Sequence, residues 1–135
     1  MNALFYLKLY LMTIPVFFAI DLLWLGVVAK NLYQKNLSHL LAPAVNWPAA
    51  LAFYFIYIAG IILFAVRPAL ADPSVARAAL WGALFGFFTY ATYDLTNLAT
   101  LRDWPLRVVL VDIAWGTLLC ALVASASYLV GRWLA

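Results

Sequence analysis

Long runs of apolar residues, separated by short polar segments, dominate the chain. Four runs predict membrane-spanning helices, because a bilayer takes about 20 apolar residues to cross. They cover residues 9–29, 48–66, 78–98 and 106–130. Apolar positions within each run are continuous rather than alternating, which argues against a transmembrane β-barrel. The pattern predicts an all-α fold: a four-helix transmembrane bundle that forms one domain over residues 1–135.

The connection between the first two runs, residues 30–46, has a different pattern. At helical spacing its apolar side chains gather on one face and most of its polar ones on the other. The apolar face holds Leu32, Tyr33, Leu37, Leu40 and Leu41, and the polar face holds Lys30, Gln34, Lys35 and Ser38. We expect an amphipathic helix that either lies along the membrane surface or extends the first span.

Three short motifs mark the starts of helices: Asn46-Trp47-Pro48, Asp72-Pro73 and Asp103-Trp104-Pro105. In each, a residue that can cap a helix precedes a proline, which fits the first helical turn. We therefore expect Asp72 and Asp103 to be capping residues rather than functional acids.

The composition assigns the class of protein. Hydrophobic residues make up 69% of the chain and charged residues 10%, whereas a soluble domain is about 25% charged. With a mean hydropathy of +1.02, the chain is expected to be an integral membrane protein. Its net charge of +3 is scattered, without a basic run, so nucleic-acid binding is not predicted.

Basic residues do not determine the membrane orientation. An even number of spans puts both termini on one side, and four basic residues border the spans on each side. Lys8, Arg67, Arg77 and Arg132 lie on the side of the termini, and Lys30, Lys35, Arg102 and Arg107 on the other. We favour cytoplasmic termini only because a short uncleaved N-terminus commonly stays inside.

Three acids, Asp21, Asp94 and Asp112, fall within the predicted spans. An Asp at the centre of a spanning helix costs about 2.5–3.5 kcal/mol, so three of them require an explanation. Counting residues from the charged ends places all three roughly 8–13 Å below the surface opposite the termini. At 3.6 residues per turn each shares a helix face with an aromatic or amide side chain. The predicted pocket comprises Asp21, Trp24, Tyr90, Asp94, Asn97, Asp112 and Trp115, with Arg102 and Arg107 at its mouth.

Two interpretations of these acids compete. They hold the helices together through hydrogen bonds, or they line a polar cavity that binds or protonates a molecule. Ser, Gly or Asn would pack helices at lower cost, which favours the second. The leading hypothesis is binding or translocation of a small hydrophobic or amphipathic molecule, coupled to protons. One alternative is a membrane enzyme that acts on a lipid or isoprenoid by carboxyl acid/base chemistry. Another is a non-catalytic assembly or stress factor.

Other chemistry has little support in the sequence. There is no His/Cys cluster, Gly-rich phosphate loop or nucleophile elbow, so no metal and no cofactor is predicted. We interpret the lone His39 as interfacial and Cys120 as a small buried hydrophobe. Gly82 and Gly86 have the spacing typical of close helix packing. The expected partners are membrane lipids and a small hydrophobic or amphipathic ligand. The sequence does not decide whether the protein forms a homo-oligomer.

The strings "DLLWLG", "GALFGFFTYATYDLTNLATLRDWPL" and "VDIAWG" resemble the DUF 2177 family of bacterial predicted membrane proteins. The resemblance extends over nearly the whole chain. It implies a complete, small, multi-pass protein of the bacterial inner membrane with four spans, and it assigns no catalytic residue.

Overall fold

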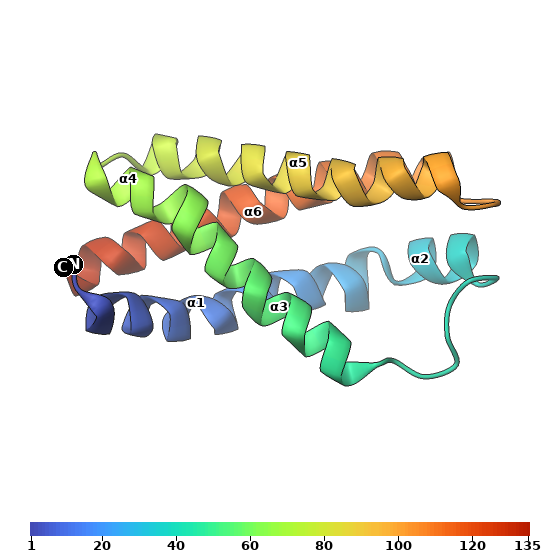
Figure 1. Ribbon diagram of the computed structural model, residues 1–135, viewed down its shortest axis with the longest axis horizontal. Helices are drawn as coiled ribbons and strands as arrows, with labels where there is room; N and C mark the ends of the chain where they lie inside the picture. Colours follow the sequence, from blue (N-terminus) through green and yellow to red (C-terminus); the bar gives the residue numbers. More distant parts are fainter.

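The computed structural model describes residues 1–135, and every regular element in it is a helix (Figure 1). The all-α prediction is thus confirmed. In chain order the elements are α1 (Ala3–Leu23), η1 (Trp24–Val28), α2 (Lys30–Leu37), α3 (Trp47–Ile61), η2 (Ile62–Val66), α4 (Arg67–Ala71), α5 (Val75–Thr100) and α6 (Leu106–Leu134). Two π-helical segments connect consecutive helices: η1 follows α1 and precedes α2, and η2 joins α3 to α4.

Three helices are long and apolar enough to cross a membrane: Ala3–Val28, Trp47–Ala71 and Leu106–Leu134. The predicted fourth span is not confirmed. Its residues form α5, which is long enough with 26 residues, but α5 is not among the three. The physical reason is that Thr92, Asp94, Thr96 and Asn97 make the second half of this helix too polar.

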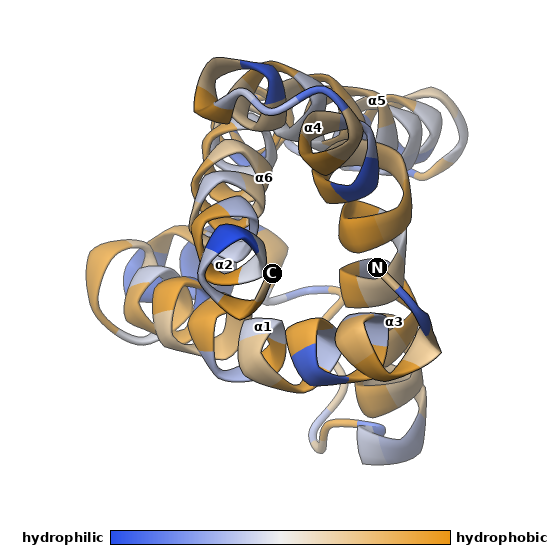
Figure 2. Cartoon of the chain, turned by 90° about the vertical axis from the view of Figure 1, so that its left-hand side faces the viewer, coloured by the Kyte–Doolittle hydropathy of each residue, from blue (hydrophilic) through white to orange (hydrophobic).

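The outer surface is apolar, as lipid contact requires. Only 30 of 135 residues are buried, so most hydrophobic side chains of this chain face outward. Leu4, Leu7 and Leu11 on α1 are each more than half exposed. Hydrophobic colouring covers most of each long helix, and the hydrophilic segments are few (Figure 2). A water-soluble protein of this size rarely exposes so large an apolar surface.

The buried side chains follow rows spaced four residues apart. The row on α1 is Leu9, Thr13, Phe17 and Asp21; that on α5 includes Ala78, Gly82, Gly86 and Asp94. The row on α6 includes Val108, Asp112, Gly116, Cys120, Ala124 and Tyr128. Such rows form the ridges through which helices pack against each other. Each of the three acids is therefore one member of a packing ridge.

The close approach of α5 and α6 depends on glycine, as the Gly82/Gly86 spacing predicts. A Cβ atom added at Gly82 would lie 2.4 Å from the carbonyl oxygen of Cys120. One added at Gly86 would lie 2.1 Å from that of Gly116. Both distances are far below van der Waals contact, so only glycine allows this packing.

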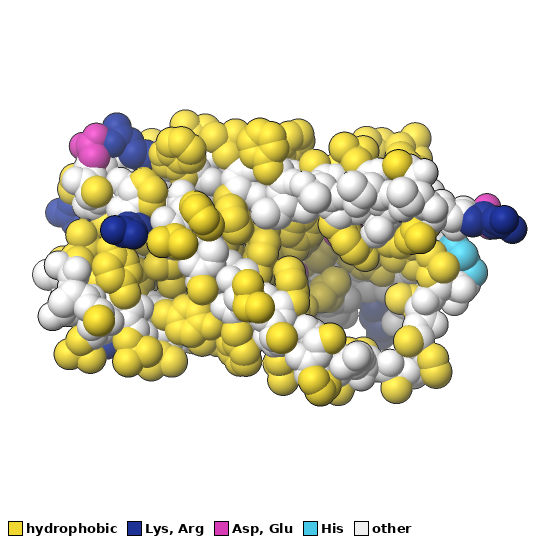
Figure 3. Space-filling view, in the orientation of Figure 1, with side chains coloured by type: hydrophobic (Ala, Val, Ile, Leu, Met, Phe, Trp, Pro, Cys, Tyr) yellow, Lys and Arg dark blue, Asp and Glu magenta, His cyan; other side chains and the backbone are white.

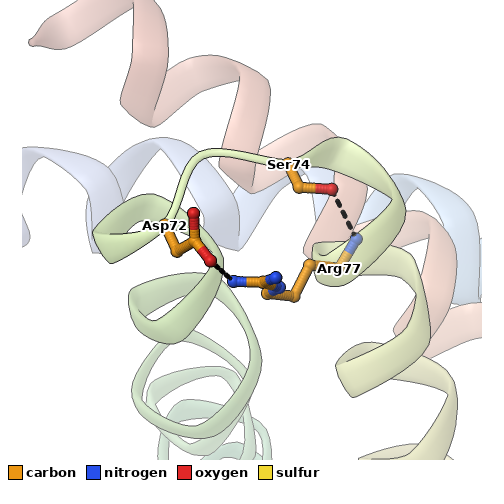
Figure 4. Close-up of polar contacts among 3 residues, drawn as sticks. All are labelled: Asp72, Ser74 and Arg77. Carbon is orange, nitrogen blue, oxygen red and sulfur yellow. Dashed lines mark hydrogen bonds and ion pairs between the residues drawn. The ribbon is translucent and has the colours of Figure 1, made fainter.

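One of the three predicted caps is present. The side chain of Asn46 accepts a hydrogen bond from the backbone N–H of Ala49, with Pro48 in the first turn of α3. Asp72 is not a cap: Ser74 caps α5 by accepting from the N–H of Arg77, and Asp72 pairs with the Arg77 guanidinium (Figure 4). The hydroxyl of Ser74 directly precedes the helix, whereas Asp72 lies two residues too early.

Asp103 is not a cap either. Helix α6 begins at Leu106 after Pro105, with no side-chain cap. Asp103 instead has a positive φ of 58° in the turn between α5 and α6, and its carbonyl oxygen lies 3.0 Å from Nε2 of His39. Asp tolerates this left-handed conformation better than most residues, which explains its presence in the turn.

The segment after α1 extends that helix rather than forming a separate layer. Figure 1 draws α2 beyond the end of α1, along the same general direction, after a break at Ala29. Helix α2 stops at Leu37, which is buried, while Leu40 and Leu41 are exposed in the connection that follows. The two chain termini lie together at the opposite end of the molecule (Figure 1).

Candidate functional site

A cavity of about 700 Å³ lies in the half of the molecule away from the termini. Figure 3 shows a recess there, between α5 and the beginning of α3. Residues from η1, α2 and all of the longer helices line it, and 13 of the 17 lining residues are hydrophobic. The site is thus an aromatic chamber with a few acids. Its polar members are Asp21, Thr89, Asp94 and Asp112, together with the tips of several Tyr and Trp rings.

Asp21 receives two hydrogen bonds from neighbouring helices. The hydroxyl of Tyr54 on α3 donates to Oδ2 at 3.2 Å, and Nε1 of Trp115 on α6 donates to Oδ1 at 3.3 Å. The residue as a whole is only 6% exposed. Each of its oxygens has a donor, so this acid ties three helices together, as the structural interpretation of the acids expects.

Asp112 is held by a chain of two aromatic donors. Nε1 of Trp24 donates to the Tyr33 hydroxyl at 3.0 Å, and that hydroxyl donates to Oδ1 of Asp112 at 2.8 Å. The rings of Trp24 and Trp115 stack, with centroids 4.4 Å apart. Tyr33 lies on α2, outside the spans, where burial and the nearby Asp112 raise its pKa. Tyr33 therefore keeps its proton and remains a donor.

Asp94 is different from the other two acids. It is fully buried, adjoins Asp112, and neither of its oxygens has a hydrogen-bond donor. A buried polar group without a partner is rare, and it is costly when the group is charged. The indole Nε1–H of Trp104, also in the lining, is a second buried atom without a partner. The lining thus contains one acceptor group and one donor that have no hydrogen-bond partner, both of them buried from solvent.

The aromatic walls are positioned by close helix contacts. A Cβ atom at Gly116 would lie 2.2 Å from Cγ of Tyr90, so the Tyr90 ring lies directly on the α6 backbone. The Tyr57 hydroxyl lies 2.7 Å from Oγ1 of Thr89 and 3.1 Å from Sγ of the buried Cys120. These contacts orient the two phenol rings that separate the cavity from the rest of the core.

Six of the seven predicted pocket residues line this one cavity: Asp21, Trp24, Tyr90, Asp94, Asp112 and Trp115. Asn97 does not line it, because the inward row on α5 repeats every four residues and passes through Asp94 and not Asn97. Arg102 and Arg107 are exposed, lie outside the lining and form no ion pair. Trp104, between the two arginines, and Val108, directly after Arg107, belong to the lining instead.

Sequence reasoning missed several aromatic residues of the site: Tyr33, Phe53, Tyr54, Tyr57, Tyr93 and Trp104. A signal for some of them existed. A buried carboxylate needs donors, and in an apolar helix the available donors are the Tyr hydroxyl and the Trp indole. Which Tyr reaches which Asp depends on how the helices cross.

The arrangement can bind a molecule of moderate size through apolar contact and through hydrogen bonds to Asp94 or Trp104. No three His, Cys, Asp or Glu side chains converge closely enough to hold one metal ion.

Comparison with known proteins identifies the family. Neither curated proteins nor solved structures provide a match to the chain. The family described as "Predicted membrane protein (DUF2177)" matches residues 6–129, which is most of the chain and includes all three acids of the cavity. The chain therefore belongs to the DUF2177 family of predicted membrane proteins.

Proposed function

We propose that this membrane protein binds a small hydrophobic or amphipathic molecule in its aromatic cavity and holds or translocates it. The observation that carries the proposal is Asp94, fully buried and without a donor in a cavity of about 700 Å³. Sites for small molecules are concave, mostly apolar and typically 300–1,000 Å³, with a few polar groups that orient the ligand. Both the volume and the composition of this lining support the proposal.

The position of the cavity also supports an amphipathic ligand. The middle of α3 contributes Phe53, Tyr54 and Ile56 to the lining, and Ile56 is 72% exposed on the outer surface. A molecule dissolved in the bilayer would therefore reach the cavity beside α3 without crossing the polar connection after α2. Such a route suits a ligand that partitions into lipid.

Coupling to protons is part of the proposal. No basic side chain forms an ion pair with any of the three acids of the cavity. The one ion pair of the structure joins Asp72 to Arg77 (Figure 4). A carboxylate left uncompensated in an apolar site is costly, so a ligand that leaves must be replaced by something that neutralises charge. A proton is the smallest such group, which favours exchange of ligand against proton.

We further propose that the protein lies in the bacterial inner membrane, with α5 as a fourth span and cytoplasmic termini. The arrangement of the two termini at one end supports an even number of spans (Figure 1). The close glycine packing of α5 on α6, a predicted span, supports placing both helices in the membrane.

Native mass spectrometry of gently extracted protein tests the binding function. Wild type should carry a small molecule or take up decanol as a neutral amphiphilic probe. Leu25→Trp should weaken this binding, because Leu25 lines the cavity and the larger side chain fills it. Leu22→Trp is the matched control: it lies on the same helix, is 58% exposed and is not in the lining.

Three outcomes are informative. Loss of binding in Leu25→Trp alone supports the proposal. Equal binding by both variants places the ligand elsewhere and refutes it. A folded wild type that carries nothing and binds neither decanol nor a charged amphiphile of the same length also refutes it, and leaves an assembly role in which the acids only join helices.

A further inference from the structure

All charges inside the cavity have the same sign. Three carboxyl groups line it, and no Lys, Arg or His does. The basic residues of α2, Lys30 and Lys35, are exposed, as are Arg102 and Arg107. The fold therefore supplies no countercharge to the acids of its own chamber, so their charge is neutralised either by a proton or by a ligand that carries a positive charge.

We propose that the ligand is an organic ammonium ion: an amphipathic amine whose N–H groups donate to Asp94 and whose apolar part lies against the aromatic walls. This inference rests on the proposed function and specifies the chemistry of its ligand.

Asp94 is the one acid of the three whose two oxygens both lack a hydrogen-bond donor. Asp21 already receives two donors and Asp112 one, whereas both oxygens of Asp94 receive none. A protonated amine provides up to three N–H donors and a positive charge, which is the complement of an unpartnered carboxylate. Hydrogen bonds between two charged groups are also shorter and roughly twice as strong as neutral ones.

The walls of the cavity suit a cation with an apolar body. Tyr57, Tyr90 and Tyr93 line the cavity together with Asp94, and the stacked pair Trp24 and Trp115 lines it as well. Aromatic faces carry partial negative charge and attract ammonium groups, most strongly when water is excluded. The rings thus reinforce the carboxylate while they bury the apolar part of the ligand.

Other charged ligands fit less well. An anion would face three acids and no basic group, and like charges brought together repel each other. A single metal ion would need at least three converging ligands from these side chains, and no such group exists. Water does not reach the oxygens of Asp94, so an amine must turn a lining side chain aside to contact them.

Three probes that share a ten-carbon alkyl chain test whether the ligand needs a positive charge. They are decylamine, decanol and decanoate, each titrated into purified protein at pH 7. Binding is measured by native mass spectrometry and by the shift in melting temperature. We expect decylamine to bind wild type about 10–100-fold tighter than decanol, the factor that a hydrogen bond to a charged group contributes. Decanoate should bind least.

The contrast between amine and alcohol should vanish in Asp94→Asn, which keeps the shape of the side chain and removes its charge. Asp72→Asn is the matched control, because it makes the same change at an exposed position in the turn between α4 and α5, and neither Asp72 nor its neighbours in the chain belong to the lining. This control should retain the preference of wild type.

The results separate this inference from the function on which it rests. Equal binding of decylamine and decanol by wild type overturns the ammonium inference but leaves a neutral amphiphile as ligand. Tighter amine binding that Asp94→Asn does not change overturns the role of Asp94. Absence of binding by all three probes overturns both. Because the first comparison uses wild type alone, it holds even if Asp94→Asn does not fold.

Discussion

Gly86→Ala tests the packing that carries Asp94 into the cavity. The added Cβ would lie 2.1 Å from the carbonyl oxygen of Gly116 and 2.9 Å from Cβ of Cys120. Since carbon atoms pack at about 3.5–4.0 Å, α5 and α6 must separate by roughly 1 Å. The obstacle is backbone, which cannot rotate away as a side chain could.

The size of the effect follows from two opposing contributions. Overpacking of a close contact costs typically 1–3 kcal/mol, and the rigid backbone here puts Gly86→Ala at about 3 kcal/mol. Alanine regains about 1 kcal/mol of helix propensity. We therefore expect a net loss of about 2 kcal/mol. Decanol and decylamine binding should fall as well, because Asp94 lies two turns further along the displaced helix.

Thermal unfolding in detergent measures the change, with Gly26→Ala as control. A Cβ at Gly26 has no atom within 4 Å, so this variant gains helix propensity without a clash and should melt at or above the wild-type temperature. If Gly86→Ala melts as high as Gly26→Ala, α5 and α6 do not pack as described, and the account of the cavity fails with them.

Three further predictions follow from single contacts. Tyr33→Phe removes the donor to Asp112 and should cost about 1–3 kcal/mol at neutral pH. Because the pKa of Tyr33 is raised in the folded state, the unfolded chain loses the phenol proton at a lower pH than the folded protein does. Wild-type stability should therefore decline above pH ~10, and less steeply in Tyr33→Phe. Parallel curves of melting temperature against pH would contradict this. Ser74→Ala should cost about 1 kcal/mol through loss of the α5 cap, whereas Asp72→Ala breaks only an exposed ion pair and should cost less; chemical or thermal unfolding that ranks them in reverse would restore Asp72 as the cap. Asp103→Gly should leave the melting temperature unchanged or raise it, because glycine adopts the positive φ without strain, and a clear loss would show that the side chain has a role.

The sequence alone determines the class of protein and the positions of its helices. Long apolar runs and scarce charges are local properties, so they predict helix ends within about six residues of those observed, whereas of the three caps before proline only Asn46 was predicted correctly. The run at residues 78–98 shows the boundary of this reasoning. It forms a long helix, but because its second half is polar, it is not one of the three helices that are apolar enough to cross a membrane.

The sequence also predicts that three acids in apolar helices raise the free energy of membrane insertion, because that energy depends on the residue type. Counting along helices of known rise placed them at one level, and Asp21, Asp94 and Asp112 line one cavity.

Tertiary structure alone decided which acids receive hydrogen bonds. The donors come from other helices: Tyr54 and Trp115 for Asp21, and Tyr33, 79 residues away, for Asp112, whereas Asp94 has none. No periodicity within one helix encodes such partners. They depend on crossing geometry, which here is set by glycines that let α5 contact the backbone of α6. Asn97 lies outside the lining for the same reason, since the ridge that packs repeats every four residues and reaches Asp94 instead.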